Sequence, residues 1–260
     1  MACLDRDVPT HLSFEQHLAG LRDATQMMAR HCTAAGLDVD VPTCPEWTVR
    51  RMIGHQGRVH RWSRALLRGE EIDAAATEKA GRSSSDPVGW LRDGAIALVS
   101  TLVETPEDVD VKVILHDPPP PRLFWARRQH HETTMHGVDA LAASLGRLPR
   151  AEETWIGVDT ALDGIDELVM GFVPRSSSRL RVEPDADPVR IVVRTPEAAH
   201  SWSVVVTDDA PVVARHEAGS APADVDVVIE APAVALYLAL WHRTDEVTSD
   251  GLAAWESMRV

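Results

Sequence analysis

Residues 127–140 read Arg-Arg-Gln-His-His-Glu-Thr-Thr-Met-His-Gly-Val-Asp-Ala and lie within a predicted helix of about residues 122–145. On this helix Glu132 and His136 are four residues apart, so their side chains leave the same face. A divalent metal uses this spacing to take two ligands from one helix. The stretch therefore favours a helical fold built around a metal site.

The two histidines before Glu132 face other directions. His131 points roughly 100° away from Glu132 around the helix axis, and His130 also leaves that face. A third ligand would therefore have to come from another helix. A glutamate and a histidine four residues apart also form an ordinary surface hydrogen bond, and in a chain with 12 histidines such a pair can arise by chance. The pair alone leaves both interpretations open.

A second segment, residues 42–62, offers the third ligand. It reads Pro-Thr-Cys-Pro-Glu-Trp-Thr-Val-Arg-Arg-Met-Ile-Gly-His-Gln-Gly-Arg-Val-His-Arg-Trp, and Thr48 can cap a helix that runs to about residue 68. His55 lies two turns into this helix, and the nearby glycines would allow a backbone or a ligand to approach closely. The alternative is a core histidine that donates to a carbonyl oxygen.

The other notable side chains of this segment are assigned to structure. Trp47 and Trp62 are predicted to pack in the core, and His60 points to another face of its helix. Cys44 stands in the loop before the helix. A thiol there could be a ligand or a nucleophile, but we interpret Cys44 as a small buried residue that anchors the loop.

Helical periodicity extends through the whole N-terminal part of the chain. Residues 70–85 are small and polar and are predicted to form a loop. The expected helices cover residues 14–35, 48–68, 87–104, 122–145 and 154–172.

The composition changes after Pro174, where residues 175–179 resemble a linker. Beyond it, β-branched and alternating residues predict strands, followed by a helix at residues 231–243. We expect an all-α domain at residues 1–174 and a small α+β domain with an antiparallel sheet at residues 180–260. The expected strands are residues 180–182, 190–194, 202–207, 212–216 and 225–229.

Composition excludes several classes of partner. The net charge of -14 repels phosphate backbones and anionic membranes, so we expect neither nucleic acid nor a membrane as a partner. Cys3, Cys32 and Cys44 are odd in number and widely spaced, which argues against a disulfide framework. Residues 1–14 lack the apolar stretch of a signal peptide. We therefore expect a cytoplasmic monomer or small homo-oligomer.

Together the two segments resemble the mycothiol-dependent maleylpyruvate isomerase family. The first segment has the pattern Pro-x-Cys-Pro-x-Trp-Thr-Val, followed by His55 and Trp62. The second is similar to that family's signature in Arg-Arg-x-His-His-Glu-x-x-x-His-x-x-Asp-Ala. The resemblance covers the N-terminal half well and the C-terminal domain loosely. It implies a DinB-like four-helix bundle in the N-terminal domain.

The resemblance also implies a site and a chemistry. A divalent metal, usually zinc, would be held by His55, Glu132 and His136, with mycothiol as the thiol cosubstrate. The activity implied is addition of the thiol to an electrophilic small molecule, as an S-transferase or a cis–trans isomerase. Gly137 replaces the larger residue that the family pattern has after the second metal-ligating histidine.

The resemblance further implies an arginine after an apolar helix of the C-terminal domain. The matching stretch, residues 238–243, reads Leu-Ala-Leu-Trp-His-Arg, so Arg243 is the candidate for holding a substrate or cofactor carboxylate. His242 stands where the family pattern has a small residue. The alternative for Arg243 is a helix-terminal cation that interacts with the helix dipole.

Two other functions remain open at this point. The same three ligands could activate water, which would make the protein a metal-dependent hydrolase. The bundle could also serve a non-catalytic regulatory protein that senses a metal or a ligand.

Overall fold

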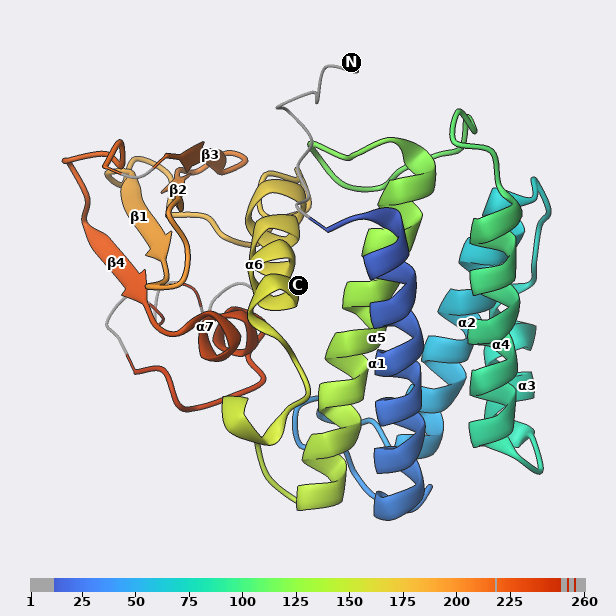
Figure 1. Ribbon diagram of the computed structural model, residues 1–260. Coiled ribbons are helices and arrows are strands. Elements are labelled where there is room, and N and C mark those ends of the chain that lie inside the picture. The colour runs from blue at the N-terminus through green and yellow to red at the C-terminus, as the bar shows by residue number, and fades with distance from the viewer. Residues whose placement is uncertain (1–11, 218, 249–251, 253–254, 256–260) are drawn as a thin grey trace. The chain divides into compact units, whose positions relative to one another are not determined.

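The computed structural model describes residues 12–217, 219–248, 252 and 255 (Figure 1). The chain forms two compact units. The helical unit comprises Ser13–Val113 and Pro120–Pro149, and the sheet unit comprises the described residues of Ile114–Pro119 and Arg150–Val260 together with Leu12. Cys3 and most of the segment assessed for a signal peptide lie outside the described residues.

The helical unit is a bundle of four long helices, as predicted, with one short helix beside it. Helix α1 packs against α5 and α4, and α2 packs against α4, α3 and α5. No helix among the described residues is both long and apolar enough to cross a bilayer. The five helices are α1 (Phe14–Ala35), α2 (Val49–Leu67), α3 (Ala74–Ser83), α4 (Pro87–Glu104) and α5 (Pro121–Leu145).

Local sequence signals explain where these helices begin and end. Ser13 and Gln16 form a reciprocal capping box at the start of α1, and Gly36 ends this helix with a φ of 92°. The side chain of Thr48 accepts a hydrogen bond from the Arg51 amide and so caps α2. Gly146 ends α5 in the left-handed conformation, which a residue with a Cβ rarely adopts.

Helix α3 corrects the expected loop at residues 70–85. Asp73 caps α3 through a hydrogen bond of 2.9 Å from the Ala76 amide to its carboxylate, and three alanines follow. Only Gly81 of this helix is buried. Its helical propensity and its cap therefore form the helix without an apolar stripe, which is why periodicity did not reveal it.

The sheet unit begins with helical segments and continues into a sheet of order β3-β2-β1-β4. Neighbours β1 and β2, and β2 and β3, are antiparallel, but β1 and β4 are parallel. The sheet is therefore mixed and not antiparallel throughout as expected, because the chain crosses back after β3 to the far edge of β1. The elements are η1 (Ala151–Glu153), α6 (Val158–Asp166), η2 (Glu167–Phe172), β1 (Val189–Arg194), β2 (Ser201–Val206), β3 (Val212–His216), β4 (Val227–Glu230) and α7 (Ala233–Leu240).

Three further details of this unit differ from the sequence expectation. Residues 180–182 form no strand, although the Val182 amide donates to the Thr207 carbonyl. The single helix expected at residues 154–172 is divided into α6 and the π-helical turn η2. Contacts group residues 150–174 with the sheet unit, whereas the expected domain boundary was residue 174. That boundary stays a prediction.

Candidate metal centre

The helical unit brings His55 of α2 together with Glu132 and His136 of α5. Each offers one ligand atom, and these atoms lie within 4.8 Å of one another. Glu132 Oε1 is 3.8 Å from His55 Nε2 and 3.6 Å from His136 Nε2. Ligand atoms of a tetrahedral zinc site lie roughly 3.3 Å apart, given metal–ligand distances of about 2.0–2.2 Å. The donor set and its separations therefore fit a divalent cation after a small contraction.

The second oxygen of Glu132 has a separate partner. Arg128 Nη2 donates to Glu132 Oε2 at 2.7 Å, which leaves Oε1 directed to the two histidines. Burial would raise the pKa of Glu132, but the charge of Arg128 and the interactions with both histidines hold that pKa well below its usual range. The carboxylate is therefore ionised, as a metal ligand must be.

A buried carboxylate supports His136 from behind. Asp139 Oδ2 is 2.9 Å from His136 Nδ1, and Asp139 also accepts hydrogen bonds from Thr43 Oγ1 at 2.6 Å and Cys44 Sγ at 3.4 Å. Burial alone would lower the pKa of His136, but the hydrogen bond to Asp139 and the nearby Glu132 carboxylate outweigh it and raise the pKa to about 9. A carboxylate on Nδ1 fixes the ring and leaves Nε2 to face the site.

The hydrogen-bond partners of His55 suit metal binding less well than those of His136. Arg58 Nη2 lies 3.3 Å from His55 Nδ1, and because arginine only donates, this contact places the acceptor on Nδ1. Metal ligation through Nε2 would favour a proton on Nδ1, and a protonated Nδ1 cannot accept a hydrogen bond from Arg58. Arg58 would therefore have to move away from His55 towards Glu78, its ion-pair partner at 3.2 Å. Burial, the largest effect, lowers the pKa of His55 and favours the neutral ring that binds metal.

Trp47 forms one wall of the site, which the sequence analysis did not predict. Its ring centroid is 4.8 Å from that of His55 and 5.9 Å from that of His136, and it is nearly parallel to the His136 ring. The Glu132 and His55 side chains remain 26% and 22% exposed, so a small molecule can reach the cluster. Trp62 packs edge-on against Trp125, in agreement with a structural role.

Arg243 lies in the sheet unit, after the end of α7. Its Nη1 donates to the Trp241 carbonyl oxygen at 2.6 Å. That bond agrees with the structural alternative for this residue. Its role towards a substrate or cofactor carboxylate stays a prediction.

Asp139, Thr43 and Arg128 also belong to the site, although the sequence analysis assigned them no role. Arg128 stands four residues before Glu132, a spacing that predicts an ion pair on one helix face. Asp139 stands three residues after His136 on the same helix, so spacing could have indicated this pair too. Thr43 comes from a distant loop, and no local signal identifies it.

Comparisons with known proteins identify a matching family model and two solved structures of similar fold. The family model described as mycothiol maleylpyruvate isomerase N-terminal domain matches residues 18–141. A crystal structure of the mycothiol-dependent maleylpyruvate isomerase is 16% identical with a TM-score of 0.58, and that of a point mutant is 15% identical with a TM-score of 0.59. Each match covers 92% of this chain and 94% of the other chain. At such identities the likeness establishes a common fold. No curated protein matches the chain significantly.

Proposed function

Because residues 18–141 belong to the family of mycothiol maleylpyruvate isomerase N-terminal domains, we propose that this chain is a metal-dependent enzyme that uses mycothiol to attack an electrophilic small molecule. The observation that carries the proposal is the convergence of His55, Glu132 and His136 at a partly exposed position. Three protein ligands leave a coordination position open, which is typical of catalytic rather than structural zinc sites.

The chain's own residues would prepare the centre for this chemistry. Glu132 Oε1 and the two Nε2 atoms would hold the cation, and Asp139 would keep the His136 ring in orientation. A bound divalent cation lowers the pKa of a thiol at its open position, so that thiolate is available near neutral pH. The aromatic wall of Trp47 would limit the directions from which a cosubstrate can approach.

The reaction would begin with addition of the thiolate to an electrophilic carbon. In a cis–trans isomerisation, addition to a conjugated double bond permits rotation, and elimination then restores the double bond and releases the thiol. In an S-transferase reaction the carbon–sulfur bond is kept. Arg243 would orient an acidic group of the substrate.

Other expectations from the sequence stay predictions. These are a cytoplasmic location, a monomer or small homo-oligomer, zinc as the metal, and no nucleic-acid or membrane partner.

The first test is the metal content of the purified protein and of His55→Ala and Glu132→Ala. Both variants should contain less zinc than the wild type, whereas His116→Ala, which changes an exposed histidine outside the cluster, should not. Equal zinc in all four proteins would contradict the site.

The second test is turnover of a cis-conjugated keto acid and of a generic electrophile with and without mycothiol. Acceleration above the rate of free thiol, lost in His55→Ala, supports the proposal. Thiol-independent hydrolysis would instead support the metal-dependent hydrolase. No turnover with any substrate, despite bound metal, would favour the regulatory protein.

A further inference from the structure

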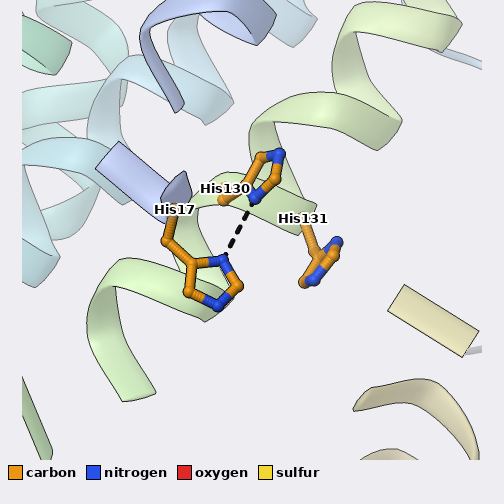
Figure 2. Close-up of side chains that lie close together, drawn as sticks. All are labelled: His17, His130 and His131. Carbon is orange, nitrogen blue, oxygen red and sulfur yellow. Dashed lines mark hydrogen bonds between the residues drawn. The ribbon is translucent and has the colours of Figure 1, made fainter. Parts of the chain in front are cut away.

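A second cluster of ligating side chains lies elsewhere in the helical unit. It consists of His17 on α1 and the neighbouring His130 and His131 on α5, and one nitrogen of each lies within 4.8 Å of the others. Figure 2 shows the three rings close together, with His17 and His130 joined through ring nitrogens. His17 was not predicted as a ligand, because one histidine on an amphipathic helix gives no spacing signal.

The separation of the nitrogens resembles that of a metal site. His17 Nδ1 and His130 Nδ1 are 3.2 Å apart, close to the roughly 3.3 Å between ligand atoms of a tetrahedral zinc ion. The His131 ring stacks on His130 with centroids 4.9 Å apart, and it lies 6.0 Å from the His17 ring. Because imidazole binds a metal in the plane of its ring, ligation by all three residues would require the His131 ring to rotate out of this stacked position.

The backbone of α1 holds the His130 ring in place. A Cβ added at Gly20 would lie only 2.1 Å from His130 Nε2, so this ring rests directly on the glycine. With Nε2 against Gly20, Nδ1 is the nitrogen that faces His17. Glycine at this position therefore permits the close approach of two imidazoles that a larger residue would prevent.

The three histidines of this cluster are more deeply buried than the side chains of the first cluster. His17, His130 and His131 are 0%, 3% and 1% exposed, whereas the side chains of the first cluster are 11% to 26% exposed. Because the cluster is closed to a substrate, a bound ion would have a structural role, with a water molecule completing the coordination by three imidazoles. Imidazole nitrogen suits zinc as well as other late first-row divalent metals. The competing interpretation is a simple N–H···N hydrogen bond between His17 and His130.

We propose that His17, His130 and His131 form a second divalent-metal site, structural in role and able to bind zinc, that ties α1 to α5. Two of its ligands are 113 residues apart in the chain, so the ion would stabilise a long-range contact of the bundle. This site does not depend on the proposed catalytic function.

The experiment measures zinc binding at the His17, His130 and His131 cluster in a variant whose first cluster has lost a ligand. Metal-free His55→Ala protein is reloaded with Zn²⁺, desalted and analysed for zinc. It should keep one tightly bound ion, and X-ray absorption at the zinc edge should show three imidazole ligands. Added Zn²⁺ should also raise the melting temperature of this variant on the order of 5 °C. Because the cluster itself is intact, this measurement does not depend on whether cluster variants fold.

Variants then assign the ion to these residues. In the His55→Ala background, His17→Gln should abolish the bound zinc and the thermal shift, while His31→Gln, on the same helix but outside the cluster, should leave both unchanged. The proposal is overturned if His55→Ala binds no zinc tightly, or if His17→Gln leaves its zinc in place. Failure of the proposed function would appear separately, as unchanged zinc content between the wild type and His55→Ala.

Discussion

Replacing Asp139 with asparagine tests how the candidate centre is supported. The substitution preserves size and removes the charge behind His136, whose Nδ1 lies 2.9 Å from Asp139 Oδ2. The carboxylate also accepts hydrogen bonds from Thr43 and Cys44, and its side chain is fully buried. An amide has only one acceptor oxygen, so the asparagine side chain could not accept from all three partners.

Two independent estimates give the size of the effect. A hydrogen bond to a charged group contributes about 1.5–3 kcal/mol. Loss of a carboxylate that supports a metal-ligating histidine typically lowers metal affinity about 10–100-fold, or about 1.4–2.7 kcal/mol. Solvent does not screen the interaction, because Asp139 is buried. We therefore expect the zinc dissociation constant to rise by about 10–100-fold.

The assay is competition for Zn²⁺ against a chelator of known affinity at constant pH. Both proteins carry His17→Gln, so that only the centre with His136 is titrated. Thr43→Val is the matched control, because it removes one hydrogen bond to Asp139 and leaves the charge, and its effect should be smaller. Wild-type zinc affinity in a correctly folded Asp139→Asn protein would refute the supporting role.

Three further predictions concern acid stability, thiol reactivity and metal affinity. Burial, aided by the charge of Arg61, lowers the pKa of His60 to about 3. In the unfolded chain the His60 side chain has a pKa of about 6.5, so it is protonated before the folded protein as pH falls. The stability that neutral His60 contributes above about pH 6.5 is therefore lost progressively towards pH 3. The loss at pH 5 should be about 2 kcal/mol, and denaturant titrations at pH 7 and 5 should show that His60→Gln removes it; an equal loss in the variant contradicts the assignment. Burial raises the pKa of the Cys32 thiol to about 12, so peptide mapping after alkylation of the folded protein at pH 8 should find Cys44 labelled and Cys32 unlabelled. Arg58→Gln should raise zinc affinity several-fold in the chelator assay, because it removes the cationic donor beside Nδ1 of the ligating His55 ring. A loss of affinity would show that Arg58 does not oppose ligation by His55.

The sequence predicted the parts of the fold that depend on local signals. The helices expected at residues 14–35, 48–68 and 122–145 end at such signals: the capping box at Ser13, the Thr48 cap and the terminal glycines Gly36 and Gly146. Alternating β-branched residues marked β1 to β4. Spacing on one helix also predicted that Glu132 and His136 share a face.

The remaining features depend on contacts between distant residues. The parallel pairing of β4 with β1 follows from a crossover that no turn motif specifies. Trp47 was interpreted as core because an aromatic side chain is usually buried, and only the folded chain places it beside two histidines. Thr43 meets Asp139 across 96 residues of sequence. Periodicity shows which face of a helix is apolar, but it does not show which loop will cover it.

Helix α5 shows why two clusters can coexist in one small bundle. Burying polar groups is unfavourable unless each group has a partner, yet most of the polar side chains of this helix are buried. Residues advance by 100° along a helix, so His130 and Glu132 point roughly 200° apart. One face of α5 therefore meets His17 of α1, and the opposite face meets His55 of α2. Because the two faces share no ligand, a change that empties one site should leave the geometry of the other intact.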